Sequence, residues 1–416
     1  MNGSTRHGDV LPRRGPGLPL LGRAPDPTAA TPAFAAKGFR PFFLGAGAFA
    51  ALILPVWLLT LAGVLGPTRY LDAVTWHAHE MLFGFTVAVI AGFLLTAVGN
   101  WTGRETLVGT PLLAIGALWV LGRVAMAFAG ALPRGVAAAV DLAFLPALVV
   151  AIARPLVATR NRRNFVMVAV VTVLWVANLL LHLDTLGVIH DWNHRAVTLA
   201  LDVIVLLLIV ITGRVVPMFT KNATGVASVR SLPTLDKAAM AAMVATTLLD
   251  LVAPSDMRLG GSAAVVAAVL VVLRSSTWGT FRTARVPLTW ILHAGHAWIA
   301  VGLALRGAAA FTGSIPAVVA THALTVGAIG TLTLAMMSRV TLGHTGRKLE
   351  ASRVAVASFV LVTLAALVRV FGPLADMAAY RTWLFAAGLL WTAAFGCFVV
   401  AHAPLLVSRR ADGKPG

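Results

Sequence analysis

The stretch WHAHEMLFGFTVAVIAGFLLTAV (residues 76–98) combines two histidines and a glutamate with an apolar run long enough to cross a bilayer. About 20 apolar residues form a helix as long as the hydrocarbon core is thick. Several more such runs follow in the chain of 416 residues, of which 59% are hydrophobic and only 12% charged. The pattern predicts a polytopic membrane protein. Its spans are expected to be helices, because an isolated strand leaves its backbone unsatisfied in lipid.

The apolar runs predict an all-α transmembrane bundle of about twelve helices. Residues 1–39, rich in Pro, Gly and Arg, are predicted to form a disordered basic cytoplasmic tail. Residues 40–406 form the predicted transmembrane domain, residues 407–416 a short basic cytoplasmic tail, and residues 214–235 the longest loop. The expected helices are 42–65, 77–99, 107–129, 135–153, 165–183, 196–213, 236–253, 261–273, 287–306, 315–338, 352–371 and 382–406.

Positive residues are distributed unevenly between the two sides of this predicted bundle. Of the 33 Lys and Arg residues, 25 fall on the side that carries both termini, seven fall on the other side, and Arg123 lies inside a span. Loops rich in Lys and Arg stay in the cytoplasm, so both termini are expected there. The net charge of +18 is scattered over short loops, which argues against nucleic-acid binding. A single cysteine, Cys397, excludes an internal disulfide framework and a thiolate-rich metal site.

Polar residues inside the predicted spans gather at one depth. Arg123 and Asp141 lie equally deep on neighbouring helices, and we expect an ion pair, because a lone Arg at depth costs about 2.5–3.5 kcal/mol. Intramembrane acids also mark proton paths, for which Glu80 and Asp202 are candidates. The residues at this outer level come from six predicted helices and are His77, His79, Glu80, Arg123, Asp141, Asn178, His182, Asp202 and His322.

The histidines have two interpretations. Neutral imidazole is a common ligand of haem iron and copper, but a histidine in a helix bundle more often hydrogen-bonds a neighbouring carbonyl. We favour the second interpretation for His182, His344 and His402, and more strongly for His7, His190 and His194. We favour the ligand interpretation for His77, His79 and His322, which share a level with acids.

For two histidine pairs, the spacing along the helix decides whether the side chains point the same way. His293 and His296 share one face of a helix nearer the cytoplasm, and both interpretations stay open for them. His77 and His79 lie two positions apart, so on a helix they point to nearly opposite sides. They serve one site only if His77 precedes the regular helix.

Several collinear motifs resemble those of the NnrS family. They are residues 40–44 (RPFFL), 76–85 (WHAHEMLFGF), 91–98 with 100–103, 213–220 (GRVVPMFT), 293–298 (HAGHAW), 322–330 (HALTVGAIG), 338–339 and 342–347 (LGHTGR). The resemblance spans residues 38–405. One departure is His296, where many relatives are expected to carry an aromatic residue such as Tyr, and this favours His293 as the ligand of that pair.

The resemblance implies a multi-pass protein of the bacterial cytoplasmic (inner) membrane that carries haem and copper. It also implies a role in the nitric oxide response, in which the protein relieves nitrosative stress or supports denitrification. No established ligand set accompanies the resemblance. We therefore expect His77 or His79 to bind iron opposite His322, with His293 at the second metal or a second axial position.

The remaining polar residues receive supporting roles in this hypothesis. Glu80 orients an imidazole, Arg123 alternatively pairs with a haem propionate, and Asp141 and Asp202 support the ligands or carry protons. The expected partners are the lipid bilayer and nitric oxide or its metal adducts.

Two other functions fit the same sequence. One is a proton-coupled secondary transporter with an outward-facing polar pocket, because twelve spans and intramembrane acids are typical of transporters. The other is a structural or sensing partner of a respiratory complex. A terminal oxidase or nitric oxide reductase is disfavoured, because the dense paired histidines of those sites are not evident. No enzymatic reaction is assigned.

Overall fold

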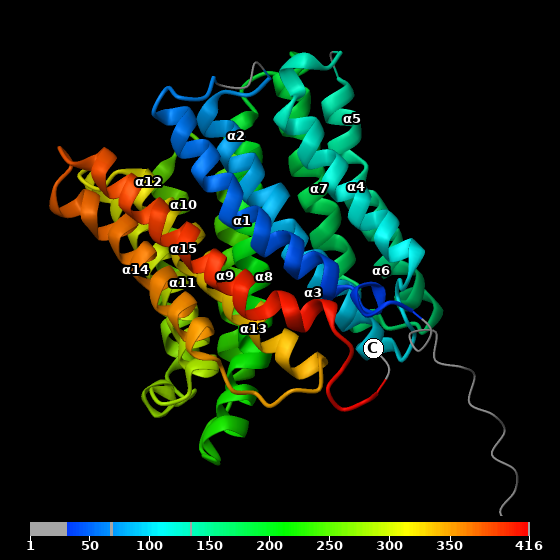
Figure 1. Cartoon of the computed structure of the whole chain (residues 1–416). Helices are drawn as coiled ribbons and strands as arrows, with labels where there is room; N and C mark the ends of the chain where they lie inside the picture. Colours follow the sequence, from blue (N-terminus) through cyan, green and yellow to red (C-terminus); the bar gives the residue numbers. More distant parts are fainter. Residues whose placement is uncertain (1–30, 67–69, 134, 415–416) are drawn as a thin grey trace, which may run out of the picture.

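The computed structural model of the chain describes residues 31–66, 70–133 and 135–414. All regular structure in these residues is helical, and they contain no strand. The helices pack side by side, with their connections at the two ends of the bundle (Figure 1). The predicted all-α class is therefore confirmed.

Within the described residues, twelve helical segments make up the bundle, and several of them are composite. Eleven are long and apolar enough to cross a membrane, and α9 falls outside that group. In chain order they are α1 (Phe39–Leu61), α2–η2–α3 (Ala73–His79, Glu80–Thr86, Val87–Thr102), α4 (Thr110–Ala127), α5 and α6 (Val136–Leu142, Phe144–Ala158), α7 (Val166–Thr185), α8 (Asn193–Thr224), α9 (Pro233–Val252), α10 (Met257–Ser275), α11 (Pro287–Thr312), α12–η6–α13 (Ala317–His322, Ala323–Gly330, Thr331–His344), α14 (Arg353–Ala375) and α15 (Tyr380–Val407). Four 3-10 turns accompany them: η1 (Ala33–Ala35), η3 (Ala129–Ala131), η4 (Arg162–Asn164) and η5 (Thr280–Thr283).

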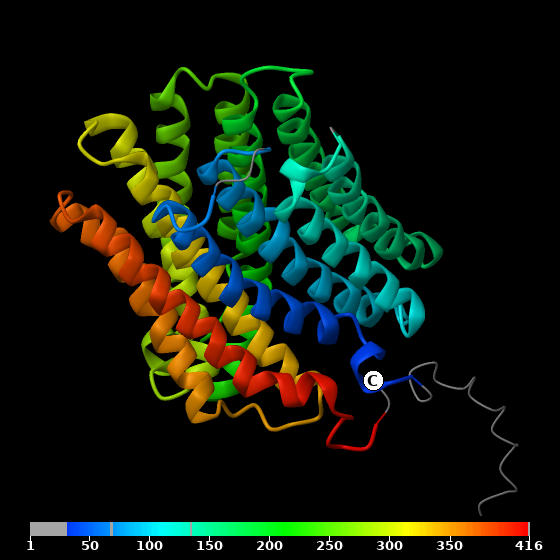
Figure 2. The same ribbon diagram turned by 45° about the horizontal axis from the view of Figure 1, so that its top comes forward.

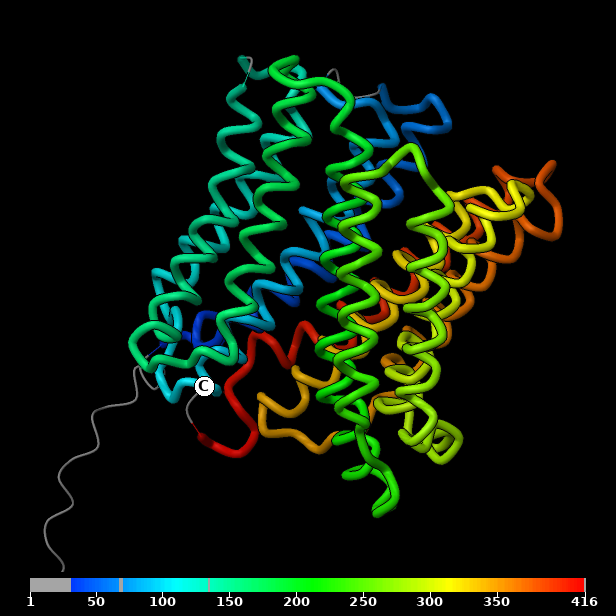
Figure 3. The backbone as a smooth tube through the Cα atoms, turned by 180° about the vertical axis from the view of Figure 1, so that it is seen from behind, coloured from blue at the N-terminus to red at the C-terminus, as the bar shows by residue number. Residues whose placement is uncertain are grey.

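Several predicted boundaries shift, and two of the shifts concern the middle of the chain. Helix α8 continues through Pro217 to Thr224, so the loop predicted for residues 214–235 is wrong over its first half. Gly225, with φ of 68°, then ends the helix in the left-handed conformation. The eighth predicted span, 261–273, is the longer helix α10, which begins after the capping side chain of Asp256. Figure 3 shows the length of α8, in green, between α7 and α9.

The predicted N-terminal tail lies mostly outside the described residues. Its last part packs on the bundle: Ala35 and Ala36 are buried, and the Ala35 carbonyl accepts a hydrogen bond from the Gly109 amide at 2.8 Å. The chain after α15 also folds back, because Arg410 Nη1 donates to the His344 carbonyl at 2.9 Å.

The first and last helices of the bundle run antiparallel and side by side (Figure 2). The guanidinium of Arg40, at the start of α1, donates to the carbonyls of Leu406 at 3.0 Å and Ser408 at 2.7 Å. Both ends of the helical domain therefore lie at one end of the bundle, which we call the termini end. The opposite end is called the distal end. Its assignment to the outer side of the membrane stays a prediction.

Two segments change in mid-course to the wider π-helical winding, which is rare and frequent at functional sites. The π segment η2 follows directly after His79, and η6 follows directly after His322. Local chemistry fixes where each composite segment begins. Asp72 Oδ1 accepts from the amides of Val74 and Thr75 before α2, and the extended Pro316 precedes α12. Both histidine-bearing segments thus begin at the distal end.

Candidate functional site

A cavity of about 380 Å³ lies at the distal end, within the size range of small-molecule sites. Segments of α1, α2–η2, α8, α12–η6, α14 and α15 enclose it, and most of its walls are aliphatic or aromatic, including Trp57, Phe85 and Trp391. Its ionisable lining residues are His77, His194, His322 and Arg369, and no described lining residue is an acid. The cavity is therefore apolar with a cationic character.

His77 and His322 reach this cavity from two different helices. The His77 ring stacks on Trp57, with ring centroids 4.0 Å apart and an interplanar angle of 18°. The indole is itself held, because Trp57 Nε1 donates to the Ala73 carbonyl at 3.1 Å. The orientation of the His77 imidazole is thereby fixed.

His322 has a defined tautomer. Its Nδ1 lies 2.7 Å from the Val318 carbonyl oxygen, which only accepts, so the proton is on Nδ1. The lone pair of a neutral imidazole then belongs to Nε2. A hydrogen bond from one ring nitrogen to a backbone carbonyl is the usual arrangement behind a metal-binding histidine.

Arg369, near the end of α14, lines the cavity and is almost fully buried, with 4% of its surface exposed. Its Nη2 donates to the Tyr380 hydroxyl at 2.8 Å, and its guanidinium lies 5.1 Å from the centroid of that ring. Its Nη1 has no hydrogen-bond partner among the described residues.

A second buried site lies beside the cavity, on the other face of α2. His79 Nδ1 lies 2.8 Å from Glu80 Oε1, and His79 Nε2 lies 3.2 Å from Asp141 Oδ2. Arg123 donates to Glu80 Oε1 at 2.8 Å and also forms an ion pair with Asp141. The ion pair between Arg123 and Asp141 that the sequence predicts is therefore present.

Helix α7 completes this second site. Asn178 Nδ2 donates to Asp141 Oδ2 at 2.7 Å, and His182 Nε2 lies 3.1 Å from the same oxygen. On its other side, His182 Nδ1 lies 2.9 Å from the Tyr70 hydroxyl. Burial raises the pKa of Tyr70, which precedes α2, to about 12, so this hydroxyl stays protonated and can donate to Nδ1.

The charges of this group can be counted. Glu80 and Asp141 are both 3% exposed or less, and Arg123 bridges them. With both acids ionised and the imidazoles neutral, one negative charge is left over. Both ring nitrogens of His79 face acceptor oxygens. One proton on His79, or one monovalent cation at the group, would bring the buried charge to zero.

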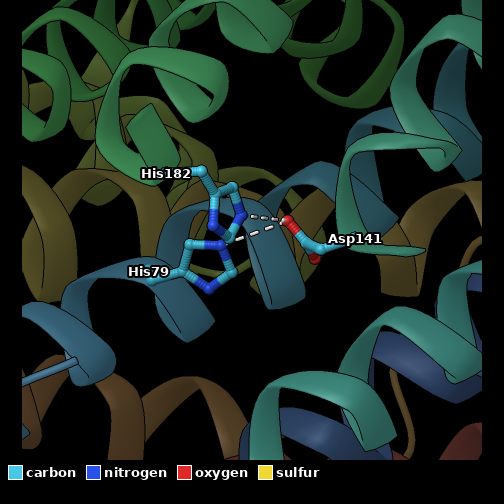
Figure 4. A group of neighbouring side chains, drawn as sticks. All are labelled: His79, Asp141 and His182. Atoms are coloured by element: carbon cyan, nitrogen blue, oxygen red, sulfur yellow. Dashed lines mark hydrogen bonds and ion pairs between the residues drawn. The ribbon is translucent and has the colours of Figure 1, made fainter. Parts of the chain in front are cut away.

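Three atoms of this group converge as metal ligands do. The ligand atoms of His79, Asp141 and His182 all lie within 4.8 Å of one another, and all three residues are buried (Figure 4). They come from α2, α5 and α7. The chain therefore contains a buried His/Asp/His group that can hold a metal ion.

A third polar group lies against a crevice of about 180 Å³ that shares His194, Thr198 and Thr321 with the cavity. Arg306 Nη1 donates to Asp202 Oδ1 at 2.7 Å, and Arg306 Nη2 pairs with Asp250. Asp202 is fully buried, and its Oδ2 has no hydrogen-bond partner among the described residues. Asp202 is therefore paired with an arginine from α11 that it shares with Asp250.

The remaining predicted candidates lie at the termini end. His293 lies with Nε2 2.8 Å from Thr220 Oγ1 and Nδ1 3.0 Å from Thr280 Oγ1. His296 lies 3.1 Å from Thr212 Oγ1 through its Nδ1. His402 donates from Nδ1 to the Phe398 carbonyl at 3.0 Å, the same kind of bond that His322 makes with Val318, but His402 does not line the cavity.

The structure separates the predicted site residues into distinct groups. His77 and His322 share the cavity, while His79, Glu80, Arg123 and Asp141 form the buried group beside it. His293 is in neither. Sequence reasoning missed Arg369 and Arg306, which count among the seven Lys and Arg residues placed on the outer side. It placed His182 at the outer level but expected a bond to a carbonyl, whereas His182 contacts Tyr70 and Asp141.

The fold places this chain among multi-pass membrane proteins, and its buried His/Asp/His group gives it the means to hold a metal. The family model described as NnrS protein matches residues 33–410, nearly the whole chain, so the chain belongs to the NnrS family. No curated protein matches it.

Proposed function

We propose that this protein binds haem and copper in the bacterial inner membrane and acts in the response to nitric oxide. Family membership supports the proposal, and one geometric observation carries it: two imidazoles from different helices, His77 and His322, line the same apolar cavity. Both termini lie in the cytoplasm in this proposal, so the cavity is at the outer side.

The cavity residues fit a haem. Its walls are apolar, His77 is held by its stacking on Trp57, and His322 keeps its Nε2 lone pair because its Nδ1 proton goes to the Val318 carbonyl. Imidazole is a common axial ligand of haem iron. A bound haem would supply a redox-active iron that can take up nitric oxide at a position left open by the protein. His77 or His322 would hold the iron, and the apolar walls would exclude water.

The second site fits copper. Imidazole nitrogen suits copper. The buried group, counted with Glu80 and Arg123, carries one net negative charge when its imidazoles are neutral. Monovalent copper would balance that charge. Glu80 would orient His79 through Nδ1, and Arg123 would hold both carboxylates in place. His293 is not assigned to a metal here, because both of its ring nitrogens lie next to threonine hydroxyls.

The test is a reduced-minus-oxidised visible spectrum of the detergent-purified protein, with iron and copper measured on the same sample. We expect a Soret band that shifts when nitric oxide is added. The variants His77→Ala and His322→Ala should lose or shift that band. His402→Ala is the matched control, since His402 is buried against Phe398 and does not line the cavity. A colourless, metal-free protein from cells with ample haem would overturn the proposal.

One observation favours proton-coupled transport as a second candidate. Asp202 is fully buried and shares Arg306 with Asp250, and both Arg306 and Asp250 line a crevice that adjoins the cavity. Transport predicts a substrate flux that is lost in Asp202→Asn and a protein without visible absorption. The spectrum described above therefore separates the two candidates.

A further inference from the structure

The guanidinium of Arg369 is a buried charge that has no counter-charge among the described residues. Of the arginines at the distal end, Arg123 pairs with Glu80 and Asp141, and Arg306 pairs with Asp202 and Asp250. Arg369 forms no ion pair with any described residue; its one hydrogen-bond partner is the neutral hydroxyl of Tyr380.

Burial of this kind is costly. A charged side chain within a membrane-spanning segment costs several kcal/mol unless it is paired or hydrated. The contacts with Tyr380 hold the guanidinium in position but do not neutralise it. Its second terminal nitrogen, Nη1, is left without a partner among the described residues. Water offers little compensation, because only 4% of the surface of Arg369 is exposed. An anionic group from outside the chain would satisfy both the charge and the free donor.

The surroundings of Arg369 define the rest of the ligand. The cavity that Arg369 lines has walls of aliphatic and aromatic side chains, no described acid, and two imidazoles. A small hydrated anion would leave most of these walls unused. The complementary ligand is an extended apolar molecule with a carboxylate at one edge, because arginine binds carboxylates through two parallel hydrogen bonds.

We propose that Arg369 binds a carboxylate of the ligand in this cavity, and that this carboxylate is a haem propionate. The assignment rests on the proposed function, since it takes haem as the occupant. It moves the propionate contact from Arg123, which is held by two carboxylates of the chain, to Arg369. Tyr380 acts as the positioning residue that keeps Nη1 directed into the cavity.

The experiment compares two probes that differ at the propionates, which are charged in one and neutral in the other. Full-length protein is purified from haem-depleted cells and titrated with haem and with haem dimethyl ester, whose propionates are neutral esters. We expect the wild-type protein to bind haem about tenfold or more tightly than the ester, since a hydrogen bond between charged groups changes a dissociation constant by about this factor. Arg369→Gln should bind both within about twofold, and Arg369→Lys should keep part of the preference.

Two controls isolate the contact. Arg381→Gln removes an exposed arginine in the first turn of α15, outside the cavity, and should leave the preference unchanged. Tyr380→Phe removes the hydroxyl that holds Nη2 and should reduce the preference less than Arg369→Gln does. If Arg369→Gln does not purify as a single species, the wild-type ratio and Arg369→Lys decide the question.

The outcomes are distinct. Tight haem binding with equal affinity for the ester would overturn the role of Arg369 and leave the proposed function intact. Binding of neither probe by the wild-type protein would overturn the proposed function and this inference with it. A preference for haem that persists in Arg369→Gln would assign the propionate to another residue.

Discussion

His77 and His79 lie two positions apart on one helix and belong to different sites. His77 lines the distal cavity together with His322, whereas His79 contacts Glu80 and Asp141 in the buried group on the other face of α2. Successive side chains at this spacing point in nearly opposite directions on a helix. One short segment therefore serves both the cavity and the His/Asp/His group.

This division predicts that substitutions of the two histidines have different effects. His77→Ala should remove or shift the haem spectrum while copper content stays near the wild-type value. His79→Ala should lower the copper content and leave the haem spectrum unchanged, since the proposed copper site then loses one of its two imidazoles. Visible spectra and copper analysis of the same purified samples check this. Parallel loss of both signals in both variants, in protein that is still monodisperse, would mean that the sites are one.

Removal of Arg123 should destabilise the protein. Arg123→Gln leaves Glu80 and Asp141 buried without their shared cation, and breaking a buried pair in this way costs about 3–5 kcal/mol. We expect a lower melting temperature in detergent. Lys37→Gln is the matched control, because its pair with Glu105 is partly exposed and contributes about 1 kcal/mol at most.

The same reasoning predicts a rescue. In Arg123→Gln/Asp141→Asn one of the two uncompensated acids is gone, so the double variant should be more stable than Arg123→Gln alone. Additive losses of melting temperature would show that Arg123 stabilises the bundle by packing and not by charge.

The fold was largely predictable from the sequence, because each span must satisfy its backbone within its own helix and so appears as one apolar run. The contact between Arg123 and Asp141 was predictable too, since consecutive helices form a hairpin that brings equal depths together. The contacts of His182 and Arg369 were not. They join helices that are distant in the sequence, and their partners depend on how those helices pack.

Charges at the ends of apolar runs were the other source of error. Arg306 and Arg369 both close such runs, and long cationic side chains there usually reach toward water. In the structure the helices continue past them, to Thr312 in α11 and Ala375 in α14. Both guanidinium groups are thereby drawn inward, one to Asp202 and the other to the cavity.

Arg306 gives a prediction of its own. Arg306→Gln leaves the fully buried Asp202 beside Asp250 without a cation, and two carboxylates that share a site cannot both remain ionised at low cost. We expect this variant to be expressed less well than the wild type. Its melting temperature should be lower at pH 8 than at pH 6, because protonation of one carboxyl group at the lower pH relieves the repulsion. Adding Asp250→Asn to Arg306→Gln should remove most of the difference in melting temperature between the two pH values. A pH-independent loss would argue that Arg306 acts only through its packing.

A glycine next to the cavity offers a test of its shape. A Cβ on Gly330, the last residue of η6, would lie 2.3 Å from the indole of Trp391, which cannot move freely because its Nε1 donates to the Ala50 carbonyl at 3.1 Å. Trp391 also lines the cavity. Gly330→Ala should therefore push the indole, cost about 1–3 kcal/mol of stability and reduce haem occupancy.

The matched control for this substitution is Gly116→Ala in α4, where a Cβ would meet nothing within 4 Å. Alanine is favoured over glycine inside a helix by up to about 1 kcal/mol, so this variant should be as stable as the wild type or slightly more stable. Thermal unfolding and haem content of the two variants check the pair. Equal haem content in both, with Gly330→Ala destabilised, would show that Trp391 supports the bundle without shaping the ligand site.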